Sequence, residues 1–396
     1  MNILYTAYYG LGKGGAEVSM SLLAREIRNK HNILIASTDE YNGFKTYKFN
    51  KNIRYLPNLN LQNRYMAGFF SKIIKEEKID IIHSHDSKTA IAAIMAAKKN
   101  NIKSVTHYRD YWFCCPRSSL LKPNMTRCEN CDIKNLRDCY SGLRLFWNSY
   151  KLEYLKKCHG ILKAADSKIA ISNAVDGKLK MIGIDDAKII PNGIDLSMFK
   201  NIKSRPEHNL RDTNIGYIGS LSYNKGLQKI TGIIKDVLRV HKKAKFIITG
   251  DGELRNAIEK EFIKFKEMVI FNGQVSYEDM ITVYNELDIV LIPSLWEEPF
   301  SRVAIEAMAA GKPIIAANTG GLNSIIKDEF GYLIDINKQN DWGDAIDLLV
   351  SKPLKRKMMG INALRESKKY DIKCIAKEIN DIYEENKDEK NTAGMH

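Results

Sequence analysis

Long apolar runs and a secretion signal are both missing from this chain of 396 residues. Its longest uninterrupted apolar stretch, residues 90–97, is far shorter than the ~20 residues that a membrane-spanning helix needs. Residues 1–4 carry no basic segment and no apolar stretch with a cleavage site, so we expect no signal peptide and a cytoplasmic protein. These absences exclude integral membrane proteins, collagen-like chains and secreted disulfide scaffolds.

Acidic side chains are scarce in one half of the chain only. The net charge is +14, and residues 1–200 hold 32 basic and 18 acidic side chains, whereas residues 201–396 hold 29 of each. An excess confined to one half indicates that this half meets something anionic, whereas a uniformly basic chain points to nucleic acid. A soluble domain that is merely rich in lysine explains the imbalance equally well.

Short β-rich runs alternate with helical patterns in two series. This alternation predicts parallel sheets built from βαβ units, and two series predict two doubly wound α/β domains in tandem. The predicted strands are 2–7, 32–37, 79–84, 103–107 and 168–172, then 213–219, 245–250, 269–272, 287–293 and 313–317. The expected organisation is an N-terminal domain at 1–190 with a Cys-rich loop at 108–142, a linker at 191–212, a C-terminal domain at 213–370, a last helix at 371–388 that crosses back to the first domain, and a disordered tail at 389–396.

A glycine-rich loop, residues 10–15, follows the first predicted strand and opens a helix. It fits G-x-G-x-x-G, and Asp39 falls about where a ribose-binding acid would lie, so an NAD-dependent oxidoreductase is one interpretation. The pattern is short for a chain with 25 glycines, and no dehydrogenase catalytic set follows it. In a second interpretation, Gly14 and Gly15 bring backbone amides close to an anionic group. A plain strand–helix turn is the third.

The most specific segment is residues 293–313, PSLWEEPFSRVAIEAMAAGKP. We expect a buried strand to end at Pro293 and a helix to begin near Pro299 or Phe300, which places Glu298 in the loop. Glu306 lies further into the same helix, and the two carboxylates suit the hydroxyl groups of a sugar. Amides at the start of the helix would hold phosphate oxygens; they belong to Phe300, Ser301, Arg302 and Val303.

At these residues the chain resembles a known family. Glu298 and Glu306 resemble the E-x7-E signature of the retaining glycosyltransferases of family 4, which have the GT-B fold of two Rossmann-like domains facing across a cleft. Five more segments resemble the family's motifs in matching order over nearly the whole chain; they are 14–17 (GGAE), 107–116 (with DYWF and CP), 190–195 (IPNGID), 219–226 (GSLSYNKG) and 250–252 (GDG).

The resemblance implies roles for individual residues. It implies that Lys225 binds the donor diphosphate, that Glu306 binds the ribose hydroxyls and that Glu298 contacts the transferred sugar. It places His107 near the sugar and the acceptor, so that the implied catalytic residues are His107, Lys225 and Glu298.

The glycine loops and one substitution belong to the same donor site. The resemblance places Gly14, Gly15, Gly219 and Gly250 against the donor. The chain departs from the family at Ser220, where an arginine usually supplies a second cation to the diphosphate. We expect Arg302 to supply that charge.

The implied chemistry needs no catalytic metal. Transfer separates a diphosphate from an oxocarbenium-like sugar, and a lysine with a helix N-terminus stabilises the growing negative charge. No Asp-x-Asp occurs in the chain, which removes the usual carboxylate pair for a metal-bound nucleotide sugar. We therefore expect no cofactor to be required for catalysis.

Five of the seven cysteines fall within the loop at 108–142, and Cys114 has no evident partner among the other four. Cys115, Cys128, Cys131 and Cys139 are separated by twelve, two and seven residues. A long loop without a core of its own needs another source of order, and a structural zinc bound by four thiolates would provide it. An iron–sulfur centre and free thiols are the alternatives.

Two predicted helices in the basic half combine aromatic and basic side chains. One spans 143–162 and the other lies near 65–77. Each is either an ordinary amphipathic helix or a surface that rests on an anionic membrane.

The sequence therefore predicts a cytoplasmic retaining glycosyltransferase, peripheral at the inner face of the plasma membrane. It is expected to move a sugar from a UDP- or GDP-sugar to a growing, lipid-diphosphate-linked surface glycan, with no nucleic acid as partner. The alternatives are an NAD-dependent oxidoreductase using residues 10–15, a zinc-organised nucleic-acid-binding protein and a sugar-nucleotide epimerase of GT-B-like form.

Overall fold

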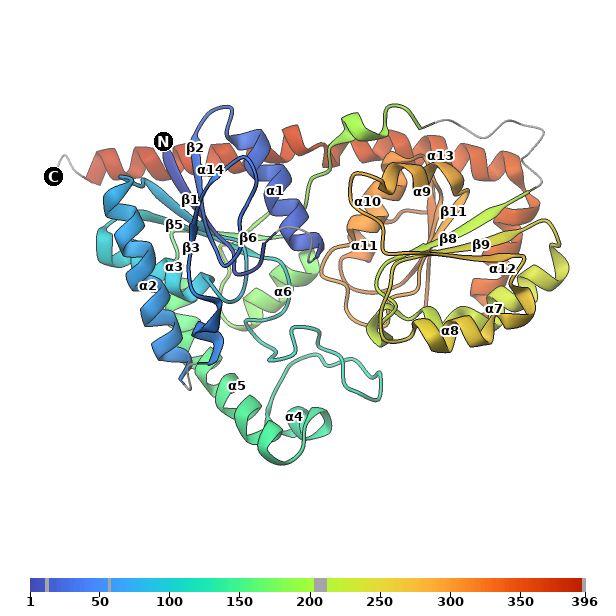
Figure 1. The fold of residues 1–396 in the computed structure, drawn as a ribbon, viewed down its shortest axis with the longest axis horizontal. Helices are drawn as coiled ribbons and strands as arrows, with labels where there is room; N and C mark the ends of the chain where they lie inside the picture. The colour runs from blue at the N-terminus through green and yellow to red at the C-terminus, as the bar shows by residue number, and fades with distance from the viewer. Residues whose placement is uncertain (11–13, 56–57, 203–211, 394–396) are drawn as a thin grey trace. The chain divides into compact units, whose positions relative to one another are not determined.

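The chain divides into two compact units in the computed structural model, which describes residues 1–10, 14–55, 58–202 and 212–393. The first unit contains Met1–Pro123, Cys128–Gly193 and the chain from Ile372 onward. The second contains Asn124–Arg127 and Ile194–Asp371. Each unit is built on a parallel sheet of its own (Figure 1).

The sheet of the first unit has seven parallel strands among the described residues, in the order β3-β2-β1-β4-β5-β6-β7. They are β1 (Asn2–Thr6), β2 (Asn32–Ser37), β3 (Lys45–Lys48), β4 (Ile81–Ser84), β5 (Lys103–Tyr108), β6 (Ser167–Ala170) and β7 (Lys188–Ile189). Tyr5 of β1 pairs with His83 of β4. The strand order reverses direction between β1 and β4, which is where open parallel sheets bind ligands.

The α-helices of this unit form at least two packing groups. The helices in its described part are α1 (Gly15–Ile27), α2 (Leu59–Glu76), α3 (Ala90–Asn100), α4 (Ile133–Cys139), α5 (Gly142–Lys163), α6 (Asn173–Met181) and α14 (Ile372–Ala393). The helices α2 and α5 both pack on α3, whereas α1 packs on α14. Leu4, Leu34 and Ile82 from the strands meet Phe70 and Ile74 from α2 in the core.

The last helix belongs to the first unit although it ends the chain. The Tyr383 hydroxyl lies 2.8 Å from the Tyr5 hydroxyl and 2.6 Å from Nδ1 of His83. Asn386 donates to Oγ of Ser167 at 2.9 Å. The helix runs on to Ala393, past its expected end at residue 388, because this segment is rich in Glu and Lys, which favour helix. Residues 389–393 are therefore helical and not a tail; 394–396 lie outside the described residues.

The described part of the second unit has six parallel strands in the order β10-β9-β8-β11-β12-β13. They are β8 (Asn214–Ile218), β9 (Lys245–Thr249), β10 (Val269–Gly273), β11 (Ile289–Ile292), β12 (Ile314–Ala317) and β13 (Gly331–Ile334). The helices are α7 (Leu227–Val240), α8 (Arg255–Glu261), α9 (Met280–Glu286), α10 (Arg302–Ala309), α11 (Leu322–Ile325), α12 (Gln339–Ser351) and α13 (Pro353–Ser367). The switch in strand order lies between β8 and β11, so the loops that follow these two strands are neighbours.

The fold class predicted from the sequence is confirmed. The ten predicted strands end within two residues of the observed ones, because their apolar runs are buried in the sheets. The short strands β3, β7 and β13 were not predicted; β3 and β7 carry lysines and are mostly exposed edges. The helix α4 lies in a stretch predicted to be irregular, and Asp132 caps it by accepting the amide of Asn135.

The turn that carries Lys225 fits closely against the loop after β11. Gly226 has a φ of 77°, and a Cβ at this position would lie 1.8 Å from the carbonyl oxygen of Pro293. The amide of Leu295 donates to the carbonyl of Asn224 at 2.9 Å. Glycine is required here because any side chain would separate the two loops.

We expect Gly226→Ala to lower the stability of the second unit by about 1–3 kcal/mol, because the methyl group meets backbone in a left-handed conformation. The matched control is Gly232→Ala in the same helix, where the added Cβ has no neighbour within 4 Å. That variant should gain roughly 0.5–1 kcal/mol from its higher helix propensity. Urea unfolding followed by circular dichroism measures both; equal effects of the two would contradict the close approach.

Candidate active site

An ion pair joins the loops that follow β8 and β11. Nζ of Lys225 lies 3.2 and 3.0 Å from the two carboxylate oxygens of Glu298. Oε2 of Glu298 also accepts hydrogen bonds from Ser294 Oγ at 2.9 Å and from the Trp296 indole at 2.8 Å. Lys225 lies 5.0 Å from the centre of the Trp296 ring. The carboxylate is buried while the lysine side chain remains 27% exposed, so the cation is fixed at an accessible position.

Glu306 is held by a second set of contacts within α10 and its neighbours. Arg302 donates to one carboxylate oxygen at 2.8 Å, and Tyr284 donates to the other at 3.0 Å. Burial disfavours the charge of Arg302, but Glu306 and Tyr277 together outweigh it and raise the pKa of Arg302 above its usual range. Burial and then Glu306 raise the pKa of Tyr284. Both groups therefore stay protonated and orient the carboxylate.

The helix after this loop begins later than predicted. It starts at Arg302, and Ser301 is its N-cap, whose Oγ accepts the amide of Ala304 at 3.2 Å. The prediction that it begins near Pro299 or Phe300 is wrong because the serine oxygen satisfies a first-turn amide. Of the four residues expected to offer amides, only Arg302 and Val303 stand in the first turn, and the Phe300 ring packs against Tyr370.

Two glycines allow the loops after β8 and β9 to touch. A Cβ on Gly250 would lie 1.9 Å from the carbonyl oxygen of Gly219. The amide of Leu221 donates to the carbonyl of Asp251 at 2.9 Å. Ser220 is exposed in this loop and exchanges a hydrogen bond with Ser222 at 2.8 Å. Arg302, which we expected to replace the arginine missing at Ser220, instead pairs with Glu306.

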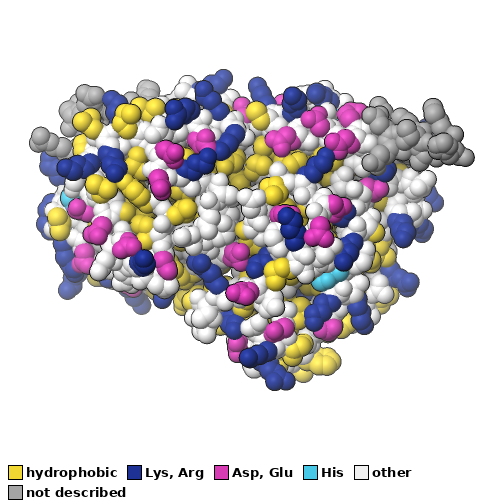
Figure 2. Space-filling view, turned by 180° about the vertical axis from the view of Figure 1, so that it is seen from behind, with side chains coloured by type: hydrophobic (Ala, Val, Ile, Leu, Met, Phe, Trp, Pro, Cys, Tyr) yellow, Lys and Arg dark blue, Asp and Glu magenta, His cyan; other side chains and the backbone are white. Residues whose placement is uncertain are grey.

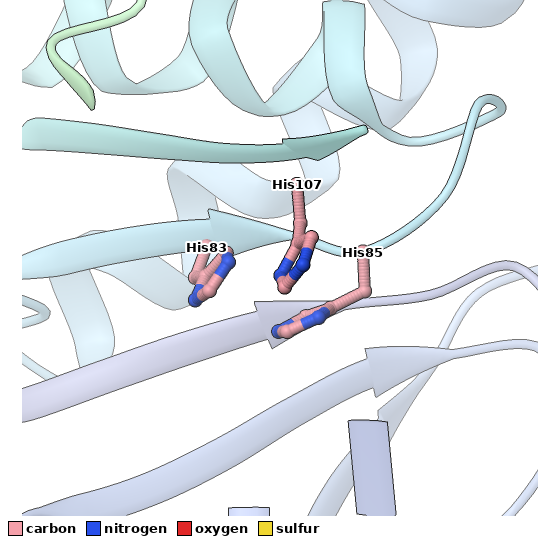
Figure 3. Close-up of side chains that lie close together, drawn as sticks. All are labelled: His83, His85 and His107. Atoms are coloured by element: carbon pink, nitrogen blue, oxygen red, sulfur yellow. The ribbon is translucent and has the colours of Figure 1, made fainter. Parts of the chain in front are cut away.

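Three buried histidines gather in the first unit, on and beside β4 and β5 (Figure 3). The His83 and His85 rings stack with centroids 4.0 Å apart, and the ring of His107 lies 5.7 Å from each. Burial and then the charge of Arg109 lower the pKa values of His83 and His107; burial, His83 and Arg109 lower that of His85. All three rings are therefore neutral near pH 7.

Arg109 determines which ring nitrogen carries the proton. Its Nη2 lies 3.1 Å from Nδ1 of His85 and 3.3 Å from Nδ1 of His107. A guanidinium only donates, so both Nδ1 atoms accept and both Nε2 atoms carry hydrogen. The Nε2 atoms are buried and have no hydrogen-bond partner in the described structure. The cluster therefore offers N–H donors for which the protein itself supplies no acceptor. The arginine is oriented by Asn192, which accepts from Nη1.

The histidine cluster is a poor fit to a metal ion. One ring nitrogen from each residue lies within 4.8 Å of the others, and within the described residues no other group of three possible ligands is that tight. Imidazole binds a metal in the plane of its ring, but these rings are stacked or tilted face to face. The Arg109 charge also opposes a second cation.

Asp39, the acidic residue near the glycine-rich loop at 10–15, has a structural role in the described structure. Asp39 accepts the amide of Gly10 at 3.1 Å and the Thr38 hydroxyl at 3.3 Å, so its carboxylate is engaged in positioning the loop. This occupation weakens the dinucleotide interpretation, in which Asp39 binds a ribose. Gly14 is the N-cap of α1 and Gly15 its first residue, while residues 11–13 lie outside the described residues. The contact of Gly14 and Gly15 with a donor stays a prediction.

Both halves of the chain match models of known enzyme families. The model described as glycosyl transferases group 1 matches residues 198–366, and the model of glycosyltransferase family 4 matches residues 13–198. The chain belongs to the GT-B glycosyltransferases. A solved structure agrees with this fold; HepE from Anabaena in complex with UDP-glucose has a TM-score of 0.72 and 19% identity, covering 97% of this chain and 100% of that one.

Two curated relatives align with this glycosyltransferase over about two thirds or more of their own length. A 42.6 kDa protein of the cps region of Klebsiella pneumoniae, whose function is uncharacterised, is 28% identical over 82% of this chain and 87% of its own. A UDP-Gal:alpha-D-GlcNAc-diphosphoundecaprenol alpha-1,3-galactosyltransferase from Escherichia coli is 27% identical over 69% of this chain and 67% of its own.

The structure of the glycosyltransferase brings together residues that lie far apart in its sequence. Lys225 and Glu298 are in contact, and Glu306 lies about one turn into α10. Sequence reasoning missed the residues that orient them, Ser294, Trp296 and Tyr284, as well as Arg109 in the first unit. Arg109 stands two residues after His107 within the motif at 107–116. Its role became visible only in the fold, where its guanidinium contacts the imidazoles of His85 and His107.

We expect the buried histidines to make the glycosyltransferase less stable in acid. Each ring stays neutral in the folded chain but takes up a proton below about pH 6.5 when unfolded, so stability is complete above that pH and is lost as the pH falls. Between pH 7.5 and 5.5, His83→Gln should lose about 1.4 kcal/mol less stability than wild type. Urea unfolding at both pH values measures this; parallel losses in the two proteins would contradict it.

Proposed function

We propose that this glycosyltransferase moves a sugar from a UDP-sugar to a lipid-diphosphate-linked glycan with retention of anomeric configuration. The contact between Lys225 and Glu298 carries the proposal, since it sets a cation beside a carboxylate at the ligand-binding edge of the second sheet. The Escherichia coli relative uses UDP-Gal and a diphosphoundecaprenol acceptor by its name, and it supports this choice of donor and acceptor class.

Lys225 stabilises the departing diphosphate. As the bond between the sugar and the diphosphate breaks, negative charge grows on the phosphate oxygens, and a fixed cation lowers the energy of that state. The Gly226 turn and the Glu298 carboxylate already hold the ammonium group in place, so little reorganisation is needed. The first-turn amides of Arg302 and Val303 add partial positive charge from α10.

The two glutamates bind hydroxyl groups of the donor. Glu306 accepts from the ribose hydroxyls, because Arg302 and Tyr284 fix its orientation and leave lone pairs for further donors. Glu298 contacts the transferred sugar beside Lys225. Retention rests on the resemblance of this pair to the E-x7-E signature.

The histidines of the first unit hold the sugar and the acceptor. Because Arg109 occupies Nδ1 of His107, this residue presents Nε2–H and donates a hydrogen bond to a hydroxyl oxygen. It does not act as a base in this state. The basic excess of the first 200 residues suits an acceptor that carries a diphosphate.

A panel of UDP-, GDP- and ADP-sugars tests the donor assignment. A ligand present at 100 times its Kd should stabilise the protein by about 2.7 kcal/mol, seen as a rise in unfolding temperature. We expect this rise with UDP-sugars. NADH should give none; a rise with NADH alone would favour the oxidoreductase. The configuration of the product, read by proton NMR, decides retention, and an inverted product would contradict that part.

We expect Lys225→Ala to lower turnover by about 10²–10³-fold, since a well-placed charge contact in a desolvated site contributes on the order of 3 kcal/mol. The matched control is Lys229→Ala, an exposed lysine one turn further along, which should keep wild-type turnover. The unfolding temperature of each variant shows that it folds. Near-normal turnover of Lys225→Ala would remove the proposed role.

We further propose that the beginning of α5 rests on an anionic membrane. Leu143 and Phe146 are 88% and 75% exposed, and Trp147 stands beside them. Arg144 is exposed between Leu143 and Phe146 on the same helix, and Arg64 and Lys134 are exposed elsewhere in the same unit. Hydrophobic and basic side chains lie next to each other at the lower end of Figure 2. Apolar contact and attraction of roughly 1 kcal/mol per basic residue favour such binding.

The other predicted basic–aromatic helix does not share this surface. In α2, Phe70 is fully buried and Phe69 packs against the same core. In α5 itself, Lys151 is drawn inward and donates to the carbonyl of Pro116 at 2.9 Å, so it adds nothing to the surface. No helix within the described ranges is long and apolar enough to cross a bilayer.

A double variant, Leu143→Glu with Phe146→Glu, should bind vesicles of phosphatidylglycerol and phosphatidylcholine at least about tenfold more weakly than wild type. Leu354→Glu on α13, at a site 74% exposed, is the matched control and should bind as wild type does. Vesicle co-sedimentation in low and high salt measures both. Unchanged binding of the double variant would exclude this surface.

A further inference from the structure

The segment between β5 and α5 has little apolar material to hold it together. It runs through residues 109–141 and contains one short helix, α4. Beyond its first turns, the fully buried apolar side chains are Leu120, Leu121 and Leu136. Five of the seven cysteines lie in this segment, and all are free of disulfides. Cys114 donates to the Tyr111 carbonyl, and the other four are Cys115, Cys128, Cys131 and Cys139.

The chain folds tightly around the sulfur of Cys115. The amide of Ser118 donates to the Cys115 carbonyl at 2.9 Å, and Ser118 and Leu120 both adopt left-handed backbone, with φ of 57° and 50°. These unusual conformations turn three amides, those of Arg117, Ser119 and Leu120, toward the sulfur as hydrogen-bond donors. Such donors stabilise a thiolate, the form in which cysteine binds metal.

The other three sulfurs gather near the first. The thiols of Cys115 and Cys131 are hydrogen-bonded to each other. Cys128 is positioned by its amide, which donates to the carbonyl of Leu120 at 2.8 Å. Cys139 ends α4 and interacts electrostatically with Cys115 and Cys128. A turn, a loop and a helix end therefore bring one pair of cysteines into contact and the other two within electrostatic range of it.

Two cations and one carboxylate lie near this cluster. Lys122 lies within electrostatic reach of Cys128 and Cys139 and is anchored to Asp138 by an ion pair of 2.8 Å. Arg117 faces Cys139. A divalent ion with four thiolates carries a net charge of −2, which Arg117 and Lys122 partly offset, while Asp138 neutralises part of the charge of Lys122.

We propose that Cys115, Cys128, Cys131 and Cys139 bind one structural Zn²⁺ that closes the segment between β5 and α5. The turn around Cys115, the contact of Cys115 with Cys131 and the proximity of Cys128 and Cys139 carry this proposal. Zn–S distances of about 2.3 Å in a tetrahedron place the sulfurs about 3.8 Å apart. No three of these sulfurs all lie within 4.8 Å of one another in the described structure. Zinc therefore draws the segment together as it binds, coupling metal binding to order in the loop.

Metal analysis of the full-length protein tests the site. Protein purified under reducing conditions without added chelator should contain about one zinc per chain. Cys131→Ser should lose most of it. Cys114→Ser is the matched control, because this neighbouring thiol donates to the Tyr111 carbonyl and is not among the four; it should keep the zinc of wild type.

A second measurement covers the case in which Cys131→Ser fails to fold. Wild-type protein is stripped of metal with a chelator and titrated with zinc alone. Its unfolding temperature is measured at each step, and the alkylation of its thiols is followed by mass spectrometry. Zinc should raise the unfolding temperature and protect the four cysteines, leaving Cys374 reactive, since it is exposed. Absence of zinc together with no effect of added zinc would overturn the proposal. So would iron with sulfide, or a disulfide between Cys115 and Cys131.

Discussion

The ion pair between Lys225 and Glu298 is the contact on which the candidate site of the second unit depends. Its carboxylate is buried and accepts three donors, so removing it would leave the lysine without a fixed position. The fold makes the pair possible because β8 and β11 are adjacent parallel strands whose following loops meet at one edge of the sheet. Gly226 then permits the backbone contact that brings the two side chains within reach.

The first unit solves a different electrostatic problem. Instead of a fixed charge for a leaving group, it buries neutral imidazoles and uses Arg109 to set where their protons lie. Burial and then the charge of Arg109 lower the pKa values of His83 and His107 and so keep these rings uncharged. Because these imidazoles keep the same protonation state near neutral pH, their N–H groups are suited to donate hydrogen bonds to hydroxyl oxygens. Tyr383 contributes from the last helix, so the end of the chain takes part in this cluster.

Ser220 leaves the donor site with one cation fewer than the resemblance implies. Arg302 is bound to Glu306 in a buried pair, where its charge serves to orient that carboxylate. Under the proposed function, the charge of the diphosphate would fall mainly to Lys225 and to the first turn of α10. Such a site would depend more on one lysine than a site with two cations.

The amino-acid sequence by itself determined the two parallel sheets, because apolar runs and helical periods are local signals that burial in a sheet requires. It also determined which loop holds Glu298, since Pro299 keeps the preceding residue out of a helix. Tertiary structure alone decided the pairing of Lys225 with Glu298, the grip of Arg302 on Glu306 and the tautomer of His107. Such contacts depend on distances between residues far apart in the chain, which only the packed sheets and their loops determine.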